Sequence, residues 1–100
     1  MKRVFVIEQG DNVGTAVLEP IDAGETVQAY GRLTGVSVMA NQAVPYGHKI
    51  ALQDIPRGGA VIKYGLSIGT ATVDIKAGDH VHVHNVESNR GRGDLAARKA

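Results

Sequence analysis

Residues 75–85 read Ile-Lys-Ala-Gly-Asp-His-Val-His-Val-His-Asn and join a tight turn to a strictly alternating run. Gly78 closes the turn, because glycine adopts the left-handed backbone that a sharp reversal often requires. From His80 to His84 histidine alternates with valine, and successive side chains of a strand point to opposite faces. We therefore expect a strand here that places three of the protein's four histidines on one face.

The turn in this stretch belongs to a pattern that occurs four times in the chain. Each copy has an aliphatic residue, two spacers, a glycine, two more spacers and a second aliphatic residue, at 21–27, 44–50, 55–61 and 75–81. Pro45 and Pro56 follow the first aliphatic residue, which we interpret as the second position of a type I turn. The copies are unevenly spaced, whereas a solenoid needs a fixed period. The pattern thus predicts four similar corners in a folded-over β-structure.

The composition agrees with a small domain made of strands. The chain has 100 residues, enough for one domain, with 13 glycines and only 4% aromatic residues. Its frequent β-branched residues favour short strands joined by tight turns. We expect an all-β domain over residues 1–86 and a flexible, polar tail over residues 87–100, with strands at 4–7, 13–18, 28–33, 36–39, 50–52, 62–64, 67–73 and 80–84.

Charge and cysteine content argue against several classes of function. The formal net charge is +1 with acidic and basic residues intermixed, so there is no electrostatic case for binding nucleic acid or a membrane. The absence of cysteine excludes a disulfide scaffold and a thiolate metal site. No segment approaches the roughly 20 apolar residues that span a bilayer, and Glu8 ends the first apolar run too soon for a signal peptide. We expect a cytoplasmic protein.

The histidines are the densest group of reactive side chains. Same-face neighbours on a strand lie roughly 6.5–7 Å apart, so His82 and His84 could converge on one metal ion, with His80 extending the row. A metal site needs a third ligand, and His48 is the candidate because it follows the glycine of another corner. The alternative is that these histidines form only a polar, half-exposed face.

Two lysines occupy otherwise apolar strands. Lys49 and Lys63 would contact an anionic substrate or, if desolvated, act as a base; alternatively, each extends its ammonium group to water. Asn85 either hydrogen-bonds at the end of the histidine strand or caps a turn. In the tail, residues 90–94 read Arg-Gly-Arg-Gly-Asp and either fold over a carboxylate or stay solvated. The chain has no Ser/His/Asp or phosphate-loop pattern.

Several blocks that occur in order carry a resemblance to a known family. They are GHKIALQDI at 47–55, VIKYG at 61–65, IG at 68–69, DIKAG at 74–78 and HVHVHN at 80–85. From Asp11 to Asn85 the chain resembles the small N-terminal domain, or separate small subunit, of altronate and galactarate dehydratases. The small subunit of (2R)-sulfolactate sulfo-lyase belongs to the same group.

The resemblance implies a β-clip (SAF, antifreeze-like) fold and a role beside a larger catalytic subunit that eliminates water from a sugar acid. It also implies dependence on a divalent metal, commonly Fe²⁺. We therefore expect the small subunit of a carbon–oxygen lyase (a hydro-lyase) that is inactive alone. The alternatives are the small subunit of a sulfolactate sulfo-lyase and a free-standing β-clip module that binds a small anionic ligand. Self-association into a homo-oligomer stays open.

The positions that match the family's blocks supply the expected site residues. We expect catalytic roles for His82, His84 and Lys63, substrate binding by Lys49 and Asn85, and metal ligation by His48, His82 and His84.

Overall fold

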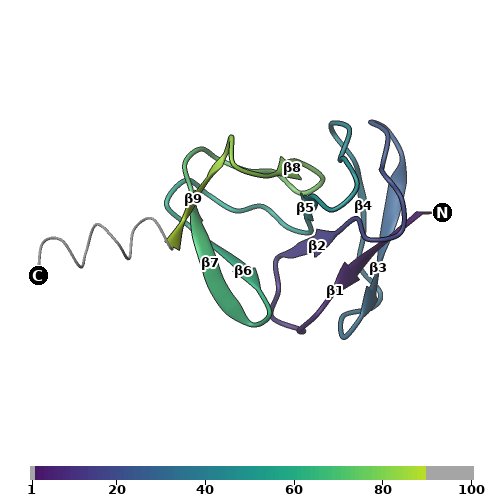
Figure 1. The fold of residues 1–100 in the computed structure, drawn as a ribbon, viewed down its shortest axis with the longest axis horizontal. Coiled ribbons are helices and arrows are strands. Elements are labelled where there is room, and N and C mark those ends of the chain that lie inside the picture. The colour runs from purple at the N-terminus through teal and green to yellow at the C-terminus, as the bar shows by residue number, and fades with distance from the viewer. Residues whose placement is uncertain (1, 90–100) are drawn as a thin grey trace, which may run out of the picture.

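The computed structural model describes residues 2–89, so the predicted tail from Arg90 onward lies outside the described residues. The described part consists of nine short strands without a helix (Figure 1), which confirms the all-β fold class. Within residues 2–89 there is accordingly no helix that could cross a membrane. The strands are β1 (Lys2–Val6), β2 (Val13–Thr15), β3 (Thr26–Gly31), β4 (Ser37–Met39), β5 (Lys49–Ala51), β6 (Ala60–Lys63), β7 (Leu66–Ala71), β8 (His80–Val81) and β9 (Val86–Ser88).

The strands form two sheets, which Figure 1 shows on opposite sides of the molecule. The larger sheet has six strands in the order β4-β3-β1-β2-β5-β8, and the smaller has three in the order β6-β7-β9. β1 and β3 are parallel, with Lys2 opposite Val27, whereas the other paired strands are antiparallel. β1 therefore lies inside the larger sheet, where Val4 and Val6 are completely buried.

The four predicted corners are present, and the same hydrogen bonds enclose the glycine in each. This glycine has a φ between 84° and 93°. Its N–H donates to the carbonyl of a buried alanine, and the N–H of that alanine donates back to the residue after the glycine, at 2.8–2.9 Å in every case. The pairs are Gly24 with Ala40, Gly47 with Ala16, Gly58 with Ala71, and Gly78 with Ala51.

The turn type in these corners differs from the prediction. The N–H of His48 donates to the carbonyl of Pro45 at 3.0 Å, so Pro45 is the first residue of the turn and Gly47 the third. A positive φ at the third position is typical of a type II turn. The prediction of a type I turn with proline second is wrong, because the N–H of Gly47 bonds to Ala16 and so does not close a turn onto Val44.

The corners associate in two pairs. Ile21 and Val44 exchange two backbone hydrogen bonds of 2.9 and 2.8 Å, and Ile55 and Ile75 exchange two of 2.8 Å. These side chains are at most 2% exposed, and burial of each contributes roughly 1.5–3 kcal/mol. The first pair lies in one hydrophobic cluster and the second pair in another. The domain therefore has two lobes, each built around one pair of corners.

Asn12 joins β6 to the segment that leads into β2. Its Oδ1 accepts the N–H of Ile62 at 2.7 Å, and its Nδ2 donates to the carbonyl of Ala60 at 2.9 Å. The N–H of Asn12 also donates to the carbonyl of Ile62 at 3.2 Å. The side chain is only 7% exposed, and a buried amide needs such partners. Asn12 therefore connects the two sheets.

β9 crosses the limit that was expected between domain and tail. Glu87 lies opposite Thr70 of β7, and Ser88 lies opposite Gly69. A Cβ atom at Gly69 would lie 2.5 Å from the Val86 side chain and 2.7 Å from the carbonyl oxygen of Glu87, so glycine is what lets β9 approach this closely. The sheet thus continues to Ser88, two residues beyond the expected limit.

Candidate functional site

The antiparallel pairing of β5 with β8 sets the geometry of the site. Lys49 lies opposite Val81, and Ile50 lies opposite His80. One further step in this register places His48 opposite His82. Their rings stack, with centroids 3.8 Å apart and planes 10° from parallel. His48 thus joins the predicted row of histidines from a neighbouring strand.

The strand predicted over residues 80–84 is shorter than expected. β8 ends at Val81, and residues 82–85 form a turn that Asn85 holds in place. The Oδ1 of Asn85 accepts the N–H of His82 at 3.0 Å, and its Nδ2 donates to the carbonyl of His80 at 2.8 Å. Asn85 is only 6% exposed. Its amide competes with the strand for these backbone groups, and the alternating pattern gave no sign of that competition.

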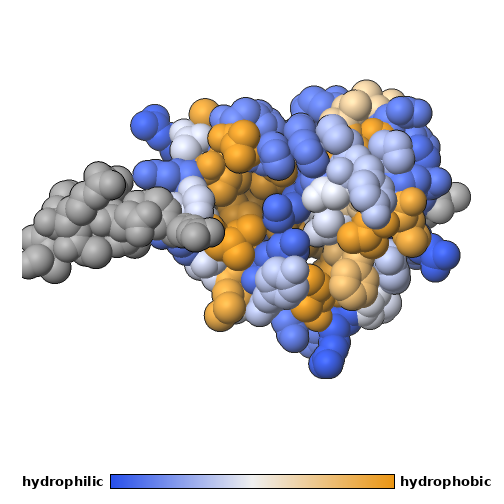
Figure 2. Space-filling view, viewed as in Figure 1, coloured by the Kyte–Doolittle hydropathy of each residue, from blue (hydrophilic) through white to orange (hydrophobic). Residues whose placement is uncertain are grey.

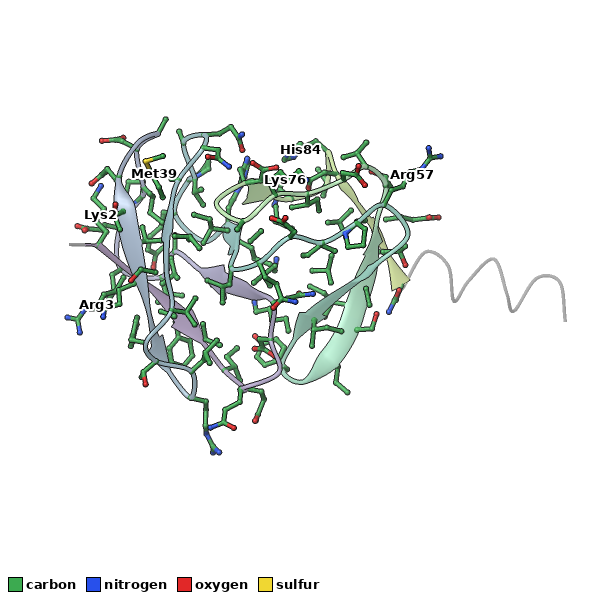
Figure 3. The ribbon with its side chains drawn as sticks, turned by 180° about the vertical axis from the view of Figure 1, so that it is seen from behind. Lys2, Arg3, Met39, Arg57, Lys76 and His84 are labelled. Carbon is green, nitrogen blue, oxygen red and sulfur yellow. The ribbon has the colours of Figure 1, made fainter. Side chains whose placement is uncertain are left out.

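All four histidines nevertheless gather in one place, here called the histidine cluster (His48, His80, His82 and His84). The Nδ1 of His48 and the Nε2 of His80 are 2.8 Å apart and share a hydrogen bond. The ring of His80 lies 5.9 Å from that of His82 and 5.0 Å from that of His84, measured between centroids. His84 is exposed at the rim of the molecule, on the same edge as Lys76 (Figure 3).

The histidine cluster disfavours protonation of its own members. Burial lowers the pKa of His80, and the neighbouring charges of His84, His48 and His82 lower it further. Burial also lowers the pKa of His82, with added effects of His48, Lys49 and His84. Since an ordinary histidine has a pKa of about 6.5, His80 and His82 are neutral at pH 7. A neutral imidazole can accept a proton.

The histidine cluster does not fit a metal ion as it lies. Within residues 2–89 no group of three or more His, Asp or Glu side chains is arranged to hold one. The rings are stacked, and the 2.8 Å contact between His48 and His80 leaves no room for an ion, which needs about 2.0–2.1 Å to each nitrogen. Metal ligation by His48, His82 and His84 therefore stays a prediction, and it would require these rings to turn.

A pocket of about 290 Å³ lies beside the histidine cluster. Lys49 borders it, and alternation along β5 directs this side chain away from the face of His48 and Ile50. His82 borders the pocket as well as belonging to the cluster. Figure 2 shows hydrophobic surface in the hollow beside the smaller sheet. The pocket is lined by Lys49, His82 and Ser88 and by the aliphatic residues Val61, Ile68, Val81, Val83 and Val86.

Lys49 is a partly buried cation that forms no ion pair within the described residues. The ion pair found there joins Lys2 to Glu25 at 2.7 Å. Burial lowers the pKa of Lys49, and the charge of Lys63 lowers it further. The ammonium of Lys63 lies 4.9 Å from the centre of the Tyr64 ring. The pocket therefore presents positive charge that a carboxylate could compensate.

Sequence reasoning missed the roles of Gln42 and Asp79, two polar residues that position the histidine cluster. The Oε1 of Gln42 accepts the N–H of His80 at 2.9 Å, and its Nε2 donates to Asp79 at 3.3 Å. Burial acts to raise the pKa of Asp79, but hydrogen bonds from the backbone of Lys76 and from Asn41 and Gln42 lower it. Gln42 precedes His80 by 38 residues. The sequence holds no local signal for a contact over that distance.

The structure thus unites some predicted site residues and separates others. His82 and Lys49 meet at the pocket, and Lys63 acts on Lys49 through its charge. His48 lies on the opposite face of β5 from Lys49. Asn85 turns its amide inward to the backbone of residues 80–82, so its expected contact with substrate stays a prediction.

The all-β fold with its paired corners, and the histidine cluster beside a pocket that Lys49 borders, describe a small domain of the SAF type. The chain belongs to the altronate/galactarate dehydratase SAF domain family, whose model matches residues 2–89. This confirms the family that the sequence resembles.

Two kinds of relatives share the domain. The chain is 44% identical over 89 residues to altronate dehydratase of Bacillus subtilis (strain 168), which covers 89% of the chain but 17% of that protein. It is 44% identical over 79 residues to altronate dehydratase of Escherichia coli (strain K12), covering 79% of the chain and 15% of that protein. It is 36% identical over 89 residues to (2R)-sulfolactate sulfo-lyase subunit alpha of Chromohalobacter salexigens, covering 86% of the chain and 95% of that subunit. The chain therefore spans a small part of the dehydratases and almost all of the sulfo-lyase subunit.

Proposed function

We propose that the chain is the small subunit of a lyase of the altronate/galactarate dehydratase type, which eliminates water from a sugar acid together with a larger catalytic polypeptide. The observation that carries this proposal is the match of residues 2–89 to the SAF domain of that family. The chain corresponds to only 17% of the Bacillus subtilis altronate dehydratase. The larger polypeptide therefore supplies most of the active site, and the chain alone is inactive.

Elimination of water next to a carboxylate needs a base, stabilisation of the enediolate that forms, and a proton for the departing hydroxide. The ammonium of Lys49 is suited to bind the substrate carboxylate, because it borders the pocket and has no ion pair within residues 2–89. A neutral ring nitrogen of His82 takes up the proton, while a protonated His84, which lies at the exposed rim outside the pocket lining, gives one to the hydroxide and regains a proton from solvent. Lys63 contributes through its charge on Lys49, and Asn85 by holding His82.

The resemblance also implies a divalent metal, with Fe²⁺ as the expectation. A bound metal would act as a Lewis acid on the leaving hydroxyl. Because the histidine cluster does not fit an ion as it lies, no step described above depends on one.

A sulfolactate sulfo-lyase subunit is the second candidate. It is favoured by the match to 95% of the Chromohalobacter salexigens subunit alpha. The same residues would serve, because a base again removes the proton next to the carboxylate while sulfite leaves in place of hydroxide. A free-standing module that binds a small anion is the third candidate, favoured by Lys49 at the pocket, whose ammonium forms no ion pair within residues 2–89.

The experiment is to purify the tagged full-length chain from its source organism together with the lyase polypeptide that accompanies it. The complex and the chain alone are then assayed with altronate, galactarate and (2R)-sulfolactate. We expect the complex to release water from one of the two sugar acids, and the chain alone to be inactive. Release of sulfite instead would favour the sulfo-lyase. Failure to recover a lyase polypeptide would contradict both subunit assignments.

Substitution of His82 tests whether this chain takes part in the reaction. His82→Gln should reduce kcat of the complex about 100-fold or more, which is the usual loss for a general base. Arg57→Gln is the control, because this exposed side chain points away from the body of the domain (Figure 3). Equal activity of the two variants would remove His82 from the proposed site.

A further inference from the structure

The hairpin between β6 and β7 projects two exposed apolar side chains. Tyr64 is 55% exposed and Leu66 is 67% exposed. The tip of the hairpin lies beside the loop that joins β1 and β2 (Figure 1), and Gly65 approaches Glu8 there. Residues 63–66 do not line the pocket described above. An exposed tyrosine outside such a pocket is suited to contact another protein.

Tyr64 has an unusual backbone for its residue type. Its φ is 60° and that of Gly65 is 71°, as in a two-residue type I′ turn. Such turns favour asparagine, aspartate or glycine at the first position, because a larger side chain is strained there. Tyr64 is the one non-glycine residue with a positive φ within residues 2–89. Strain of this kind persists where the surroundings hold the residue, and it often marks a functional position.

Asp11 holds the tip in this conformation. Its carboxylate is 5% exposed and accepts the N–H of Tyr64 at 3.2 Å and that of Gly65 at 2.8 Å. It also accepts the N–H of Glu8 at 3.1 Å, which fixes the neighbouring loop. The Tyr64 ring is therefore presented to solvent from a firmly anchored turn. A rigid aromatic side chain loses little entropy on binding.

The charge next to Tyr64 indicates what kind of surface would cover it. The ammonium of Lys63 lies 4.9 Å from the centre of the ring and forms no ion pair within the described residues. The charge of Lys63 also lowers the pKa of Lys49 at the pocket, so a partner that covered both would meet two positive charges. A complementary partner would combine an apolar socket for Tyr64 with a carboxylate for Lys63.

We propose that the hairpin tip, residues 63–66, docks into an apolar, acid-rimmed socket of the larger lyase polypeptide. This inference rests on the proposed function, in which such a polypeptide completes the site. Val61 and Ile68 of the same hairpin line the pocket, so docking at residues 63–66 would bring the larger polypeptide close to it. Tyr64 and Leu66 are then anchors of the interface. An asparagine at position 64 would adopt the turn without strain but would lack the aromatic ring that binds the partner, so the strained tyrosine is retained.

The test separates folding from binding. Tyr64→Asn introduces the residue that the turn prefers, so its thermal midpoint should equal or exceed that of the natural chain. Its Kd for the lyase polypeptide recovered with the tagged chain should nevertheless rise at least about tenfold, measured by calorimetry. Tyr64→Phe keeps the ring and should bind within about threefold of the natural chain. Tyr46→Asn is the matched control, since Tyr46 is 65% exposed on a corner and should bind normally.

Each other outcome counts against the proposal in a different way. If the natural chain binds the lyase polypeptide and Tyr64→Asn binds equally, the hairpin tip is not the docking element although the proposed function stands. If the natural chain binds no lyase polypeptide, both proposals fail. If Tyr64→Asn instead dissociates a homodimer in sedimentation, the partner is a second copy of the chain, and the proposed socket does not exist.

Discussion

Three buried polar side chains form hydrogen bonds that hold backbone segments in place, as backbone pairing does elsewhere in a β-structure. They are Asp11, Asn12 and Asn85. They are 5%, 7% and 6% exposed, and each bonds to backbone groups of another segment or of a turn. In the sequence they resemble ordinary turn residues, because Asn and Asp are common in turns for other reasons. Their roles depend on which segment lies opposite, and the sequence does not state that.

Removal of the Asn85 amide should loosen the histidine cluster. Asn85→Ala leaves the N–H of His82 and the carbonyl of His80 without the side-chain partners they have now. We expect the free energy of unfolding to fall by about 1–3 kcal/mol, measured with urea. The ring signals of His82 and His80 should shift in NMR spectra of the same protein.

Gln53→Ala is the control for Asn85, because Gln53 is exposed. It should change the free energy of unfolding by less than about 0.5 kcal/mol. Unshifted histidine signals in Asn85→Ala would show that the turn at residues 82–85 does not need this amide.

The corner is the element that sequence reasoning located best. An aliphatic residue, a glycine at the correct distance and a second aliphatic residue are local features, so the four corners could be predicted from the chain alone. Their pairing, Ile21 with Val44 and Ile55 with Ile75, is non-local and was not predicted. β9 was missed because Val86-Glu87-Ser88 lacks an apolar run and becomes a strand only by pairing with β7.

The corner glycines differ in the space around them, which yields a matched pair of substitutions. Gly58 and Gly78 both have a positive φ, so alanine is strained at either position by about 1–2 kcal/mol. A Cβ atom at Gly58 meets nothing within 4 Å, whereas one at Gly78 would collide with the carbonyl oxygen of Met39. Gly78→Ala should therefore lose about 1–3 kcal/mol more than Gly58→Ala.

Urea unfolding of the two glycine variants measures this difference directly. Equal losses would mean that the corner around Gly78 can move away from Met39. Such movement would also displace Asn41, whose backbone N–H donates to the carbonyl of Gly78 at 2.8 Å.

Across the whole molecule, the predicted site residues divide between two faces of the β5–β8 ribbon. The sequence indicated that His48, which follows a corner glycine, joins the row of histidines, and the structure places its ring against that of His82. Alternation along the strand implied that Lys49 faces away from His48, but the sequence could not show that Lys49 meets Val61 of β6 at a pocket, because that contact is non-local. Nor could it show that His82 alone among the histidines borders the pocket.

The stability of the whole domain should depend on pH through His80 and His82. Their pKa values are lowered in the folded protein, by burial first and then by His48, His84 and Lys49, but in the unfolded chain they return to about 6.5. The unfolded state therefore binds more protons just below that pH, so the free energy of unfolding falls as the pH drops through about 6.5 and levels off below the folded pKa values.

Urea midpoints at pH 7.5 and 5.5 test this dependence. The natural chain should unfold at lower urea at pH 5.5, and His80→Gln should show a smaller difference between the two conditions. A difference of the same size in both proteins would assign the pH dependence to other groups.

The position of β8 at the edge of the larger sheet has a consequence for synthesis. Its partner β5 ends some thirty residues earlier in the chain, at Ala51, so a nascent polypeptide can lay down most of that sheet before any of His80, His82 and His84 has been translated. These three histidines are then added after most strands of the larger sheet have been synthesised. A ribosome stalled before His80 would carry five of the six strands of the larger sheet but only one of the four histidines, His48.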